Sequence, residues 1–105
     1  MYGEDYKNWN IIHIEGLFTI RRVVEIKKPL ESYISIPSIK IAFDLSKVKY
    51  IDSSAITLIL NFHKRLKESD GEVVIIKPSE SIQEVLSIIG IDQVLQIYES
   101  KEHLP

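Results

Sequence analysis

The chain of 105 residues contains no cysteine, only four glycines and only four prolines. Without cysteine it forms no disulfide, thiolate nucleophile or zinc–thiolate site, and such a composition suits a reducing compartment. No glycines cluster before a predicted helix, so the loops that bind ATP phosphates or dinucleotides are missing. We therefore expect no cofactor and no kinase or ATPase activity in this chain.

Long apolar runs and a large excess of charge are also missing. No run approaches the roughly 18 to 20 apolar residues that a membrane helix needs. The acidic start, residues 1–6, is unlike a secretory signal. A net charge of -2 provides no strongly basic surface for nucleic acid. The sequence predicts a cytoplasmic protein that binds neither membrane nor nucleic acid.

What is present is enough apolar sequence for one core. Apolar residues make up 45% of the chain, and this length fits one domain of ordinary size. We predict a single domain over residues 1–105, with its core at about residues 9–98 and frayed termini.

Hydrophobic spacing predicts the strands. Alternation indicates strands at residues 9–15, 39–45 and 95–98, and an all-apolar run indicates a buried strand at 73–76. Gly16 permits a tight turn or bulge into residues 17–19, which would complete a short opening hairpin.

Spacing of three and four residues predicts three helices between these strands. The first begins at Ile20 with Thr19 as its cap, and it ends or kinks at Pro29. The second covers residues 54–68, and a left-handed Gly71 follows it. The third begins with a capping box at Ser81 and ends at Gly90. The order β-β-α-β-α-β-α-β predicts an α/β domain with a mixed, mostly parallel sheet and crossover helices.

The junction at residues 41–55 carries the most suggestive polar residues. A polar loop with Lys47 and Lys49 is predicted after the central strand. Asp52, Ser53 and Ser54 then stand directly before the apolar helix. Aspartate and serine are common N-caps, so these local signals alone favour plain capping over a regulatory site.

Three segments together resemble the anti-sigma factor antagonists of the STAS family. They are Phe43-Asp44-Leu45-Ser46 with Val48, Ile51-Asp52-Ser53-Ser54 before an apolar helix, and Gly71-Glu72-Val73-Val74-Ile75. The resemblance covers roughly residues 11–98 and implies a STAS-like fold. Ala55 departs from the glycine that is usual in the family, and Thr19 departs from an aspartate found in many members.

The resemblance also implies a function. The unphosphorylated protein would bind an anti-sigma factor that is also a serine kinase, and so release the sigma factor. Phosphorylation of Ser53, the residue directly after the aspartate, would switch binding off, and a serine phosphatase would restore it. Asp52 and Ser54 would support the helix start.

Two apolar residues of the second helix, Ile56 and Leu60, lie about 100° from its main apolar stripe. We expect them to help form the partner surface, although burial under a neighbouring segment is an equally strong alternative. The predicted partner-binding residues are Lys47, Lys49, Ser53, Ser54, Ile56 and Leu60.

Other candidate chemistry is weak. His13, His63 and His103 lack the spacing of metal ligands, and no Gly-x-Ser-x-Gly motif indicates a hydrolase. The cluster Arg21, Arg22, Lys27 and Lys28 is typical of a solvated helix face, with phosphate binding as the less common alternative. We predict a non-enzymatic interaction module. The alternatives are a scaffold-type STAS subunit that associates with copies or relatives of itself without cycling phosphate, and a small enzyme or ligand-binding domain on the same architecture.

Overall fold

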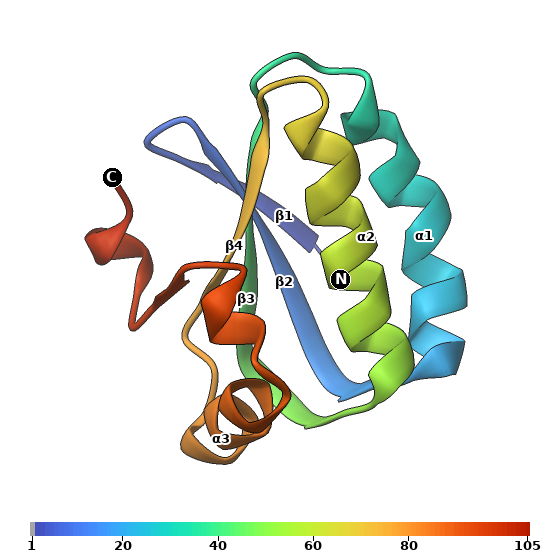
Figure 1. Cartoon of the computed structure of the whole chain (residues 1–105), viewed down its shortest axis with the longest axis vertical. Helices are drawn as coiled ribbons and strands as arrows, with labels where there is room; N and C mark the ends of the chain where they lie inside the picture. Colours follow the sequence, from blue (N-terminus) through green and yellow to red (C-terminus); the bar gives the residue numbers. More distant parts are fainter. Residues whose placement is uncertain (1) are drawn as a thin grey trace.

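The computed structural model describes residues 2–105 as one α/β domain (Figure 1). Its strands are β1 (Tyr2–Tyr6), β2 (Trp9–Phe18), β3 (Lys40–Ile51), β4 (Glu72–Ile76) and β5 (Ile97–Tyr98), and its helices are α1 (Ile20–Ile34), α2 (Ser53–Lys67) and α3 (Glu80–Ile89). The five strands lie side by side in the order β1-β2-β3-β4-β5. Only β1–β2 is antiparallel among these neighbouring pairs. The predicted α/β fold with a mixed, mostly parallel sheet is confirmed.

The two faces of the sheet are covered differently. Helices α1 and α2 lie against one face, and the C-terminal segment lies on the opposite side (Figure 1). The larger apolar cluster joins the strands to all three helices. The smaller cluster, on the other face, contains Trp9, Ile11, Ala42, Val74, Ile76 and Leu104. The central strands β3 and β4 are therefore buried on both faces, as their near-continuous apolar runs predict.

The opening hairpin differs from the prediction. Strand β2 continues through Gly16, which has a positive φ of 75°. Its pairing with β3 shifts register between His13 and Glu15 and again between Gly16 and Leu17. Its hairpin partner is β1, and the turn between them uses Lys7 and Asn8, both with positive φ. Strand β1 was missed because its sequence, YGEDY, is largely polar and carries little apolar alternation.

Helix α1 continues through Pro29 to Ile34, so the predicted end at the proline is wrong. An internal proline costs on the order of 3 kcal/mol when nothing compensates. Here Pro29 is exposed, while Leu30 is buried and Tyr33 and Ile34 pack against the core. Burial of these later apolar residues outweighs the local cost, which local sequence rules do not include.

Strand β3 is longer than predicted and includes Lys47 and Lys49, so the predicted polar loop is wrong. The added length pairs with β2, where Glu15 lies opposite Lys47 and Leu17 lies opposite Tyr50. Pairing with a neighbouring strand thus extends a segment whose own polarity indicates a loop.

The ends of two helices also differ from the prediction. After α2 the left-handed residue is Asp70, with φ 61°, and not Gly71. Glycine is needed at position 71 for space, because an added Cβ would lie 2.8 Å from the carbonyl oxygen of Ile39. Helix α3 begins two residues earlier than predicted, with Ser79 and not Ser81 as its N-cap. The predicted end at Gly90 is confirmed, with φ 93°.

The C-terminal tail packs against the sheet, so the prediction of a frayed end there is wrong. Leu104 is buried, and the indole N–H of Trp9 donates to the carbonyl oxygen of Pro105 at 3.1 Å. Lys101 bonds to Glu4 at 2.7 Å. One buried leucine in a polar tail produces no periodicity, which is why the sequence does not indicate this contact.

Candidate functional site

The candidate site lies where β2 and β3 end and helices α1 and α2 begin. Asp52 is the N-cap of α2, and its Oδ1 accepts from the Ala55 N–H at 3.1 Å. Its Oδ2 accepts from the Ile20 N–H, also at 3.1 Å. The Asp52 N–H donates to the Phe18 carbonyl oxygen at 3.3 Å. One carboxylate therefore caps the positive ends of both helices and holds the two segments together.

Thr19 does not have the capping role that the sequence predicts for it. Thr19 occupies the N-cap position of α1, but its side chain makes no capping hydrogen bond. The cap comes instead from Asp52, which is 32 residues away from Ile20 in sequence. Sequence rules search for caps only next to the helix, so they do not find this one.

Ser53 is the first residue of α2 and is exposed, whereas Ser54 is half-buried. Since Asp52 supplies the cap, the fold does not depend on the Ser53 hydroxyl for that purpose. A small hydroxyl group thus stands at the positive end of a helix, where it is accessible from solvent.

Both serines border a groove of about 380 Å³ between α1 and α2. Ile20, Leu58 and Phe62 contribute apolar surface to this groove. Beyond them, Arg65 and Glu31 form an ion pair at 3.1 Å between the two helices. The groove therefore runs along both helices, with Ser53 at the end where they begin.

The structure separates several of the predicted partner-binding residues. Ile56 is only 5% exposed and belongs to the helix-side core, and Leu60 is half-buried against that core. Burial, the alternative for these two residues, is what the structure shows for Ile56. Lys47 and Lys49 are exposed, but they border a second open hollow beside Ser79 and not the groove next to Ser53.

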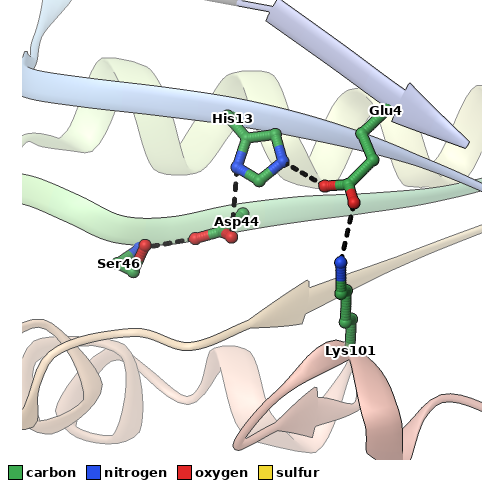
Figure 2. A network of polar contacts seen from close by, with 5 residues as sticks. All are labelled: Glu4, His13, Asp44, Ser46 and Lys101. Carbon is green, nitrogen blue, oxygen red and sulfur yellow. Dashed lines mark hydrogen bonds and ion pairs between the residues drawn. The ribbon is translucent and has the colours of Figure 1, made fainter. Parts of the chain in front are cut away.

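A polar network on the other side of the sheet was not found from the sequence (Figure 2). His13 Nε2 lies 2.7 Å from Glu4 Oε1, and His13 Nδ1 lies 3.1 Å from the buried Asp44. Asp44 also accepts from the Ser46 N–H at 2.8 Å. Hydrogen bonds to Lys101 and His13 lower the pKa of Glu4. The residues come from distant segments, so no local spacing indicates them.

This network does not form a hydrolytic site. Each ring nitrogen of His13 faces a carboxylate oxygen, so neither nitrogen is free to take a proton from a serine. The network instead connects β1, β2, β3 and the C-terminal segment. Asp44, which belongs to the family-like motif, has a structural role in this network.

His63 has a different role. Its Nδ1 accepts from the Val73 N–H at 3.2 Å and so ties α2 to β4. Burial is the main cause that lowers the pKa of His63, which keeps the ring neutral. Within residues 2–105, no three side chains of the metal-binding types gather as a metal site requires. The same range contains no helix that is both long and apolar enough to span a membrane.

Comparison with known families identifies the fold family. The sequence model of the STAS domain matches residues 4–104. The chain belongs to the STAS domain family.

Two relatives show how far the sequence similarity extends. A putative anti-sigma factor antagonist of Thermotoga maritima is 34% identical over 61 residues, which cover 58% of this chain and 54% of that protein. The chain thus spans about half the length of this relative. The anti-sigma-B factor antagonist of Listeria monocytogenes is 24% identical over 86 residues, 82% of this chain and 75% of that protein.

Solved structures agree with this assignment. The putative anti-sigma factor antagonist of Thermotoga maritima has a TM-score of 0.85 at 23% identity, covering 96% of this chain and 87% of that chain. Unphosphorylated SpoIIAA of Bacillus has a TM-score of 0.80 at 18% identity, covering 96% and 89%. Phosphorylated SpoIIAA has a TM-score of 0.73 at 18% identity, covering 96% and 92%. At these identities the likeness establishes the fold.

Proposed function

We propose that this protein is an anti-sigma factor antagonist. In its unphosphorylated form it binds an anti-sigma factor that is also a serine kinase, and this binding releases a sigma factor in the cytoplasm. The names of the relatives support the general role. The observation that carries the proposal is Ser53, an exposed hydroxyl at the first position of a helix whose cap is supplied by its neighbour Asp52.

Phosphorylation of Ser53 is compatible with the fold for a physical reason. A phosphoryl group adds about 1.5 to 2 negative charges and three acceptor oxygens. Backbone N–H groups and the helix dipole stabilise such charge at a helix start. The modification removes no capping bond, because Ser53 does not supply the cap. The domain therefore stays folded while a partner docked over Ser53 meets new bulk and charge.

The chain itself performs no chemistry in this scheme. The kinase transfers phosphate to Ser53, and a separate serine phosphatase removes it. The absence of a phosphate-binding glycine loop and the occupied nitrogens of His13 support this division of roles.

Mass spectrometry after incubation with the cognate kinase and ATP tests the site. A sensible first candidate is an ATP-binding kinase encoded beside this chain's gene. We expect one phosphate on Ser53 in the wild-type protein, none in Ser53→Ala, and unchanged labelling in the matched control Ser54→Ala. Phosphate on Ser54 or Thr57, or no phosphate at all, contradicts the assignment.

Binding of the purified phosphorylated protein tests the switch. We expect at least a tenfold weaker complex with the kinase, which corresponds to about 1.4 kcal/mol. Ser53→Ala should bind like the unmodified protein. Equal binding of the phosphorylated and unmodified forms would rule out the switch even if Ser53 is the modified residue.

A further inference from the structure

Helix α3 exposes much of its apolar side. At 3.6 residues per turn, an arc of about 160° holds all of its large apolar residues, Ile82, Val85, Leu86, Ile88 and Ile89. The core covers only Ile82 and Leu86, which lie within about 40° of each other on this arc. Val85, Ile89 and Ile88 are 36%, 53% and 79% exposed. We call these three residues the α3 face, and an exposed apolar group of this kind marks an interaction surface.

Helix α1 exposes a second apolar group. Ile20 and Val24 are 58% and 69% exposed and lie one turn apart on the same side of the helix. Three exposed basic residues lie three or four positions from Val24 and so flank it, namely Arg21, Lys27 and Lys28. We call Ile20 and Val24 the α1 face.

The charge that borders the α1 face is basic. Both acidic residues of α1 already pair with arginines, Glu25 with Arg22 and Glu31 with Arg65. Over residues 2–105, the ion pairs of the structure involve none of the three basic residues that flank Val24. The α1 face is therefore an apolar pair with a positive border.

The charge that borders the α3 face is acidic. Glu84 is exposed and lies one turn before Ile88 on α3. Residues 78–100, which contain α3, carry four acidic residues and no basic one. Figure 1 shows α3 and α1 apart from each other, with α2 between them in this view. One copy of the chain therefore cannot bring its own two faces together.

We propose that the α3 face of one copy of this chain docks on the α1 face of a second copy. This pairing joins apolar side chains at the centre of the contact and places acidic residues of α3 near basic residues of α1, as in specific interfaces. A contact between two α3 faces would instead bring Glu84 of both copies together, and a contact between two α1 faces would oppose basic residues. Charge therefore favours the head-to-tail pairing.

A head-to-tail contact leaves one face unused on each end copy, so further copies add until a chain grows or a ring closes. Only five apolar side chains form the centre of this contact, so we expect weak, reversible association with a Kd of about 10 to 100 μM. This association goes beyond the proposed function. Kinase binding and its loss on phosphorylation are measured separately, and neither depends on it.

Sedimentation equilibrium of the purified chain between about 10 μM and 1 mM tests the association. We expect the average mass to rise past that of a dimer as the concentration increases. Raising the salt from about 50 to 500 mM should weaken association at least about threefold, because salt screens the charged borders. A monomer at every concentration, or a mass that stops at a dimer, overturns the proposal.

Two variants with one damaged face each test the pairing. Ile88→Ser/Ile89→Ser keeps the α1 face, and Ile20→Ser/Val24→Ser keeps the α3 face. We expect each alone to associate at least about thirtyfold more weakly than wild type. Their mixture should recover a 1:1 complex with the wild-type Kd, because the two intact faces meet. The control Ile36→Ser removes a side chain that is 45% exposed beyond the other end of α1, and it should associate like wild type.

Three results would contradict the pairing: a double variant that still associates alone, a mixture that forms no complex, or a control that is weakened equally. Equal urea midpoints verify that the variants are folded. If a double variant unfolds, Glu84→Lys replaces the α3 variant and Lys28→Glu the α1 variant in the same mixing experiment. We expect each of these to associate at least about fivefold more weakly alone, and the same outcomes decide.

Discussion

The two faces of the sheet show how unequally one set of strands is covered. On the helix side, buried residues of α1, α2 and α3 and of the strands form one continuous cluster. On the other side, a much smaller cluster receives a single buried residue, Leu104, from the C-terminal tail. Hydrophobic stabilisation scales with the apolar area buried. The helix side therefore supplies most of the stability, and the tail side depends on a few contacts.

The strongest test of this comparison is Phe43→Ala on the helix side. Phe43 is fully buried and packs edge-to-face on Phe62, with ring centroids 6.0 Å apart. We expect a loss of about 3 to 5 kcal/mol in the free energy of unfolding, because the truncation leaves a cavity that helices cannot easily fill. Urea denaturation measures it. A loss below about 1 kcal/mol would contradict the claim that the Phe43 ring is a main contributor to the helix-side core.

Leu104→Ala tests the tail side. We expect a smaller loss, near the lower end of the range of about 2 to 5 kcal/mol for buried leucines, because a terminal segment can relax into the space. His103→Ala, at an exposed neighbouring position, is the control and should change stability by less than about 0.5 kcal/mol. If Leu104→Ala costs as much as Phe43→Ala, the two faces are equally important and the comparison is wrong.

Asp52→Ala tests how much the shared cap stabilises α1 and α2 at the end that carries Ser53. We expect a loss of about 1 to 2 kcal/mol, because the change removes the caps of α1 and α2 together. The matched control is Thr19→Ala, which should cost much less since Thr19 makes no capping bond. Amide hydrogen exchange should show faster exchange at the first turns of both helices. Faster exchange confined to α2 would mean that the bond to Ile20 contributes nothing.

The smallest expected effect is a pH dependence from His63, which joins α2 to β4. Its pKa is lowered in the fold, so its contribution is present above the unfolded value of about 6.5 and is lost as the pH falls below it. His63→Asn keeps an acceptor for the Val73 N–H but does not titrate. Between pH 7.5 and 5.5, wild type should lose more stability than this variant in urea titrations. Parallel pH profiles would show that the pKa of His63 is the same in the folded and unfolded states.

Local patterns predict much of this fold. Most of the stripe of α2, the buried runs of β3 and β4, and the end of α3 at Gly90 were predicted from the sequence and are found in the structure. Of the stripe expected in α3, Ile82 and Leu86 are buried, whereas Val85 and Ile89 are exposed. The helix start at Asp52 was also predicted, because Asp-Ser-Ser before an apolar helix is a local signal, whereas the role of Ser53 stays a prediction. Strand β1 and the continuation of α1 past Pro29 were not predicted, since both depend on neighbours that local rules do not consider.

The sequence by itself determined the α/β order, the helix start at Asp52 and the serine beside it. Only the tertiary structure decided that Ile56 is buried while Leu17 and Tyr50 are exposed, that Asp52 also caps α1, and that Leu104 covers the second face. The reason is physical. Periodicity specifies which side of an element is apolar, but whether a given apolar side chain is covered depends on elements that are distant in sequence and adjacent only after folding.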